Sequence, residues 1–158
     1  MSPEREMLRH MVATIAYRGG KAIRGAPDDF GSVSAGEGSR TAVEILAHIG
    51  DLFEWARALA DGEHRWSEST QLDWDAQVER FYDGLAHVDT RLASDEPLGR
   101  DPHRLLQGPL ADALTHIGQI ALLRRLAESP VRGENYFKAE VESGRVGPEQ
   151  NPPVFEFD

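Results

Sequence analysis

Two histidines interrupt apolar stripes and are the clearest candidates for chemistry in this chain. His48 lies three residues after Ile45 and four before Leu52. His116 lies three residues after Ala113, in a second apolar stripe. In a helix this spacing places each imidazole at the edge of the buried face, where its two ring nitrogens need partners other than water. Two such histidines on different helices can converge on one point.

A carboxylate shares the helical face of His116. Asp112 precedes it by four residues, a spacing that puts the two side chains roughly 6 Å apart on one face. With His48 from the other helix, they form a set of two imidazoles and one carboxylate, which can hold zinc or a similar ion and leave coordination positions open. An open position admits water or a substrate atom. Gln119, three residues after His116, is expected to face the same cavity and to orient a ligand or a bound water.

Each of these residues also has an explanation without a metal. Asp112 falls in the first turn after Pro109, where an acid stabilises a helix N-terminus through the helix dipole. A single buried histidine is more often a hydrogen-bonded core residue than a ligand. Spacing alone leaves both alternatives open.

Other titratable residues give weaker signals. Glu44 and Asp51 lie one turn either side of His48, but helix capping accounts for Glu44, and Asp51 is expected in solvent. The remaining histidines are expected to be structural or at the surface: His10, His64, His87 and His103. The tryptophans are expected to fill the core or to cover loops before they serve as ligand platforms.

The composition limits the chemistry further. The chain has no cysteine, which excludes a thiolate nucleophile, an iron–sulfur cluster and Cys-ligated zinc, so a metal must be held by His, Asp, Glu or water. A net charge of -10, spread along the chain, argues against nucleic acid and anionic lipid as partners. No apolar run is long enough to span a bilayer, and the N-terminal segment lacks the apolar stretch of a secretory signal. We therefore expect a cytoplasmic protein with a small-molecule substrate.

Four periodic apolar segments must position these side chains. They predict helices over about 3–24, 41–59, 73–92 and 109–130. Capping residues or prolines mark their starts: Ser2 with Pro3, Thr41 with Glu44, Thr70 with Asp73, and Pro109. Pro130 is expected to stop the last helix. Four such segments joined by turns predict an all-α fold, an up-down-type four-helix bundle around one core.

The segments between and after these helices are irregular. The Gly/Ser-rich connection 25–39 is long, and loops of that length are uncommon unless they bind or cover something. Asp101 and Pro102 predict a short helical turn that ends at Gly108. Residues 135–142 are expected to add a short C-terminal helix, followed by an extended Pro-rich tail. Together these features fit a single domain over 1–158, with its core in about 3–130 and a C-terminal extension over 131–158.

Two segments resemble the DinB/YfiT-like superfamily of bacterial four-helix-bundle proteins. They are RTAVEILAHIGDLFEWA, with a capped acid four residues before an inward histidine, and ALTHIGQIALLRRLAESPV, where a histidine precedes a small residue, a glutamine and an apolar helix. The likeness covers about 3–130 and depends on the order, spacing and number of helices rather than on one motif.

The resemblance implies one divalent ion, zinc or nickel, bound by a histidine on the second helix and an H-x-x-x-H pair on the fourth. Carried onto this chain, the ligands are His48 and His116, with Asp112 where the family has the first histidine of the pair. That aspartate either serves as the third ligand or weakens the site. Characterised relatives include transferases and isomerases that use mycothiol, bacillithiol or glutathione, so the resemblance implies a thiol cosubstrate.

Two rival functions stay open beside a thiol-dependent transferase or isomerase. A metal-dependent hydrolase would use the same ion to activate water. A non-catalytic, stress-related bundle for binding or dimerisation would use the inner histidines only as hydrogen-bonding groups. Apolar residues on the outer faces of the helices could support a homodimer.

Overall fold

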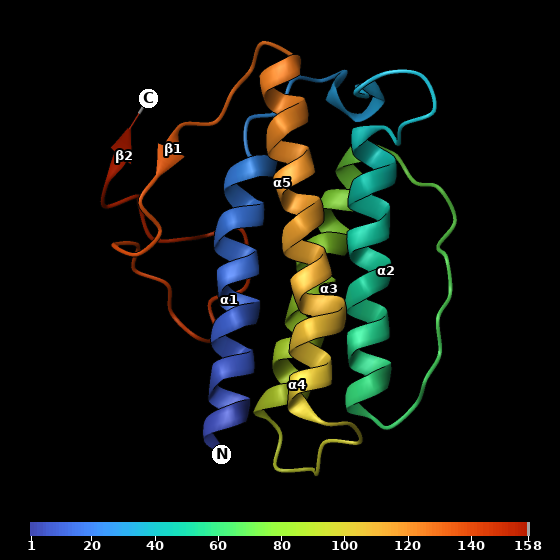
Figure 1. Ribbon diagram of the computed structural model, residues 1–158, viewed down its shortest axis with the longest axis vertical. Coiled ribbons are helices and arrows are strands. Elements are labelled where there is room, and N and C mark those ends of the chain that lie inside the picture. Colours follow the sequence, from blue (N-terminus) through green and yellow to red (C-terminus); the bar gives the residue numbers. More distant parts are fainter. Residues whose placement is uncertain (158) are drawn as a thin grey trace.

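Four long helices lie side by side along the length of the molecule (Figure 1). The computed structural model describes residues 1–157, and these helices are α1 (Pro3–Ile23), α2 (Ala42–Ala60), α3 (Trp74–Ala93) and α5 (Ala111–Leu126). The prediction of an all-α fold with four main helices is confirmed, apart from one short strand pair described below.

The helix starts follow the capping signals in the sequence. The Ser2 hydroxyl accepts from the Arg5 N–H at the start of α1, and Thr41 forms a reciprocal capping box with Glu44 at the start of α2. Asp73 caps α3, while Thr70 remains in the preceding loop. Because a cap depends on residues within one turn, these starts can be predicted from local sequence.

The approach to α5 differs from the prediction that Pro109 begins the fourth helix. The short helix α4 (Pro102–Leu105), capped by Asp101, runs directly into a π-helical segment, η2 (Leu106–Leu110), and α5 starts only after it. Gly108 has non-helical angles (φ -88°, ψ -106°), so the chain kinks there and accommodates the ring of Pro109 inside the segment.

The last helix also ends earlier than the predicted stop at Pro130. It ends at Leu126, and Glu128 adopts a left-handed conformation (φ 56°) just beyond it. The Ser129 N–H then donates back to the Arg124 carbonyl, which closes the helix end in the manner of a C-terminal cap.

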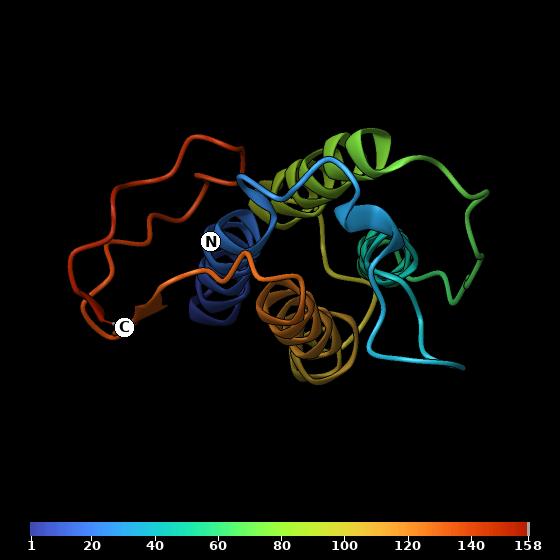
Figure 2. The same ribbon diagram turned by 90° about the horizontal axis from the view of Figure 1, so that it is seen from above.

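The predicted short helix over 135–142 is wrong. After α5, the part of the chain described to residue 157 has only the antiparallel strands β1 (Gly133–Glu134) and β2 (Glu156–Phe157), and it runs along the outer side of α1 (Figure 2). Glu134 holds it there: its buried carboxylate accepts from the Tyr17 hydroxyl at 2.6 Å and from Lys21 Nζ at 2.7 Å. These contacts fix an extended backbone, so the expectation of an extended tail holds.

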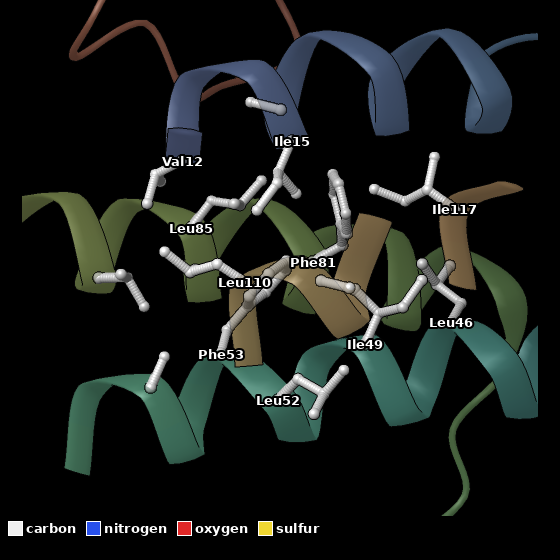
Figure 3. Close-up of a cluster of buried hydrophobic side chains, with 14 of the residues drawn as sticks. Val12, Ile15, Leu46, Ile49, Leu52, Phe53, Phe81, Leu85, Leu110 and Ile117 are labelled. Carbon is white, nitrogen blue, oxygen red and sulfur yellow. The ribbon is translucent and has the colours of Figure 1, made fainter. Parts of the chain in front are cut away.

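The core lies between the four long helices (Figure 3). Its largest fully buried side chains include Phe53, Phe81, Ile15, Leu46, Ile49, Leu85 and Ile120. Gly19 lets α1 approach α3 closely, because a Cβ on this residue would lie 2.5 Å from Cζ of Phe81. The close packing of the four helices sets the relative positions of the side chains that project between α2 and α5.

The long connection after α1 closes one end of the bundle. It contains a short 3-10 turn, η1 (Phe30–Ser32), and buries Phe30 edge to face against Trp74, with ring centroids 5.1 Å apart. The Ala42 N–H donates to the Val33 carbonyl and ties this connection to the start of α2.

Candidate metal centre

Three side chains from two helices meet on the α2–α5 side of the bundle. His48 comes from α2, and Asp112 and His116 come from α5. Each offers one ligand atom, and these atoms all lie within 4.8 Å of one another. The two imidazoles meet edge to face with centroids 4.7 Å apart. The structure thus brings together the three residues that the sequence singled out.

The spacing between Asp112 and His116 suits a shared cation. Oδ1 of Asp112 lies 3.4 Å from Nε2 of His116, beyond the usual length of a charge-assisted hydrogen bond. Two ligand atoms bound tetrahedrally at about 2 Å from one ion lie roughly 3.3 Å apart. Within residues 1–157, the Asp112 carboxylate makes no hydrogen bond to compete for its lone pairs. The donor set therefore fits a divalent ion of the zinc type.

Gln119 fixes the orientation of the His116 ring. Its Oε1 lies 2.7 Å from Nδ1 of His116 and accepts the Nδ1 proton. This leaves Nε2 of His116 with its lone pair directed to the Asp112 side, as a metal ligand requires. Gln119 contacts His116 from an exposed position, and its predicted role in orienting a ligand or a bound water stays a prediction.

His48 is held in its neutral form by its surroundings. Burial lowers the pKa of its imidazole, and the nearby His116 and Arg40 lower it further, against the opposing charges of Asp112 and Asp51. Across the described chain, neither ring nitrogen of His48 has a hydrogen-bond partner. A neutral imidazole with a free lone pair is the state that binds a metal.

The site opens to solvent on one side. The side chain of Asp112 is 48% exposed and that of His116 only 14%. The imidazoles are therefore shielded, whereas the carboxylate faces water. A cation bound here would keep an accessible position on the Asp112 side, as a catalytic site needs.

Trp66 covers His48 from the connection between α2 and α3, residues 61–73. Its ring lies 5.6 Å from that of His48 and 5.8 Å from that of Trp55, which in turn lies 5.9 Å from His64. Sequence reasoning treated Trp66 as a core or loop-covering residue and did not connect it with the site, because a contact across 18 positions leaves no periodic signal. Its cover of the site is a finding of the structure.

The two acids beside His48 do not join the cluster. Glu44 accepts from the backbone N–H and hydroxyl of Thr41, as its capping role predicted. The expectation that Asp51 is solvated is wrong: it is 5% exposed, and its Oδ1 accepts from Arg80 at 2.6 Å and from the Ser69 N–H at 3.2 Å. Arg80 reaches across the α2–α3 interface, a pairing that sequence spacing cannot reveal. Asp51 thereby anchors the 61–73 connection.

Comparison with known proteins adds no relative to this picture. No family model, curated protein or solved structure matches the chain.

No helix within residues 1–157 combines the length and apolar character needed to cross a membrane. The weaker histidines lie at the surface, as expected: His10, His64, His87 and His103.

Proposed function

We propose that this protein is a metal-dependent enzyme with a four-helix bundle of the DinB/YfiT kind, in which His48, Asp112 and His116 bind one divalent cation, zinc or nickel. One observation carries the proposal: three ligand atoms from α2 and α5 lie within 4.8 Å of one another. The Gln119 contact that frees Nε2 of His116 and the lowered pKa of His48 add independent support.

The favoured reaction is the transfer or isomerisation of a substrate with the help of a low-molecular-weight thiol. A bound divalent cation lowers the pKa of a thiol or a water molecule beside it. In a thiol transfer, the thiol proton passes to solvent, the sulfur forms a bond to an electrophilic carbon, and the leaving group departs with the electron pair of the broken bond. Asp112 would keep the site open to the thiol, while Trp66 would exclude water from the side of His48.

Hydrolysis is the second candidate, because the solvent-exposed side of the cluster at Asp112 gives water direct access. In that reaction a deprotonated water would attack an acyl carbon, and the leaving group would take up a proton as it departs. Both candidates need the same three ligands, so a metal measurement has to precede an activity measurement.

Metal content of the untagged protein tests the proposal first. We expect close to one zinc or nickel per chain, lost in His48→Ala and in His116→Ala and retained in the control His87→Ala, which changes an exposed residue on α3. Absence of metal in the wild-type protein, even after incubation with zinc and nickel, would sink the proposal and leave a non-catalytic bundle.

Turnover then separates the two reactions. The metal-loaded protein is assayed with a chromogenic aryl halide and a panel of thiols, and separately with a chromogenic ester. Thiol-dependent conjugation that disappears in His116→Ala supports transfer, whereas ester cleavage with the same dependence supports hydrolysis. Stoichiometric metal without either activity would favour a binding role.

A further inference from the structure

A pocket of about 490 Å³ lies between α2 and the 100–108 segment, and Trp55 in its wall contacts Trp66, which packs on His48. Trp55 and Leu59 form its apolar wall on α2, and Arg100, Arg104 and Gln107 form its polar wall. The pocket therefore combines an apolar floor with two cationic groups, the usual make-up of a site for a small organic anion.

The two arginines of this pocket are not engaged elsewhere. Within residues 1–157, neither the Arg100 nor the Arg104 guanidinium makes a hydrogen bond or lies within ion-pair distance of a carboxylate. Asp101 also lines the pocket: its Oδ1 accepts from both the N–H and Nδ1 of His103, and these hydrogen bonds, helped by the charges of His103 and Arg104, lower its pKa. The two guanidinium groups still outnumber this one acid in the wall of the pocket, in a chain of net charge -10.

A second arginine-lined pocket lacks this property. A pocket of about 790 Å³ on the α2–α3 side is lined by Arg57 and Arg65, but Arg57 pairs with Asp61 and Arg65 with Glu63. Its positive charge is neutralised by its own neighbours. The pocket of Arg100 and Arg104 keeps its charge for a ligand.

Trp55 supplies a further unused group. Its Nε1 is buried and has no hydrogen-bond partner among the described residues, which is uncommon for an indole N–H. A small rotation of the ring would present this donor to an oxygen atom of a ligand in the pocket.

Helix α2 and the continuous chain of η2 and α5 contribute residues to both the pocket and the metal cluster. Trp55 follows His48 by seven residues on α2, two turns along one face, which is about 10 Å of helix. Gly108, where the chain kinks, precedes Asp112 by four residues, and Trp66 contacts both His48 and Trp55. The two indole rings therefore connect the wall of the pocket to the cluster.

We propose that this pocket binds the carboxylate end of an organic anion through Arg100 and Arg104, and that the other end of the same molecule reaches His48, Asp112 and His116. The ligand class is a small acidic molecule that carries a carboxylate at one end and its reacting atom at the other. The role as substrate subsite depends on the proposed metal-dependent function, whereas anion binding by the two arginines does not.

The first experiment measures anion binding by calorimetry on the metal-free protein. The probes are S-methylglutathione, which carries two carboxylates and no free thiol, and its diethyl ester, which keeps the amino group and carries no carboxylate. We expect binding of the acid, at least roughly 10-fold weaker binding of the ester, and a similar loss for the acid in R100Q/R104Q, because in both cases the charge-assisted hydrogen bonds between guanidinium and carboxylate are lost. Arg125→Gln, an exposed position near the end of α5, is the control and should bind as wild type.

The second experiment locates the probe relative to the cluster by NMR. In protein loaded with nickel, the S-methyl protons should broaden more than the glycine protons at the carboxylate end. Equal binding of acid and ester, or binding that R100Q/R104Q leaves unchanged, overturns the anion pocket. Arginine-dependent binding with stronger broadening at the glycine overturns the orientation. If the protein binds no metal, the proposed function is refuted. The calorimetric titration still tests whether the pocket binds an anion.

Discussion

The rings of His48 and His116 meet edge to face across the α2–α5 interface, with their centroids 4.7 Å apart. Each ring is carried by a helix whose apolar neighbours are buried, Ile49 on α2 and Ile117 on α5. The relative position of the two imidazoles is therefore fixed by the core and does not depend on a bound ion.

Substitution at Asp112 should separate its two possible roles. If the carboxylate is a ligand, Asp112→Ala should weaken zinc binding by more than about 100-fold, beyond the roughly 10- to 100-fold effect of losing a supporting group. Asp112→His should keep or raise the affinity, because it supplies a third imidazole at the same position. Competition with a chromogenic chelator measures both constants, with Asp83→Ala on the exposed face of α3 as control. An unchanged affinity in Asp112→Ala would remove the carboxylate from the site.

Replacement of Gln119 tests the hydrogen bond that orients His116. Gln119→Leu removes the acceptor for the Nδ1 proton, so we expect metal affinity to fall by roughly 10- to 100-fold. Gln119→Glu keeps an acceptor and should retain most of the affinity. Because the residue is exposed, neither change should alter the unfolding temperature of the metal-free protein. If Gln119→Leu and Gln119→Glu bind the metal with equal affinity, the hydrogen bond to His116 has no role in metal binding.

The lowered pKa of His48 predicts a direction for the pH dependence of folding. Between its lowered pKa and the ordinary value of 6.5, the unfolded chain binds a proton at His48 that the folded chain does not. The contribution of this residue to the free energy of unfolding is thus fully present above the ordinary value and is lost as pH falls through that window. Urea unfolding of the metal-free protein should show this slope, and His48→Gln should reduce it. A proton NMR titration of His48 with a midpoint above 6.5 would contradict the prediction.

Arg124 should be among the most sensitive positions of the fold. It is 5% exposed, and its guanidinium donates to the carbonyls of Ala22, Arg24, Gly25 and Ser129. Arg124→Gln would leave several of these carbonyls without a donor, and we expect a loss of about 2–4 kcal/mol in the free energy of unfolding. Its exposed neighbour gives the matched control, since Arg125→Gln should change that free energy by less than about 0.5 kcal/mol. Equal losses in the two variants would refute this role.

The helix starts and part of the candidate site could be predicted from local sequence. Caps at Thr41 and Asp73 lie within one turn of the residues they bind, so they could be recognised in advance. The same holds for Asp112 and His116, whose four-residue spacing fixes a shared face. His48 could be placed near Asp112 and His116 because the apolar faces of the two helices that carry them must face one core.

Two of the failures involve partners that are distant in sequence. Tyr17 lies 117 positions from Glu134, and this contact keeps the C-terminal extension extended instead of helical. Asp51 is buried instead of solvated, because Arg80 reaches it from α3. In both cases the decisive energy is a buried charged contact, whose existence depends on the finished fold and not on the pattern around either residue.

The ring contact between Trp66 and His48 also gives the protein an optical reporter of its own. Of three tryptophans, Trp55 and Trp66 lie together near the cluster, while Trp74 packs on Phe30 at the end closed by the long connection. Indole emission is quenched by a nearby paramagnetic ion, so the tryptophan fluorescence of the unlabelled chain should decrease as nickel binds at His48, and it should decrease less in Trp66→Phe.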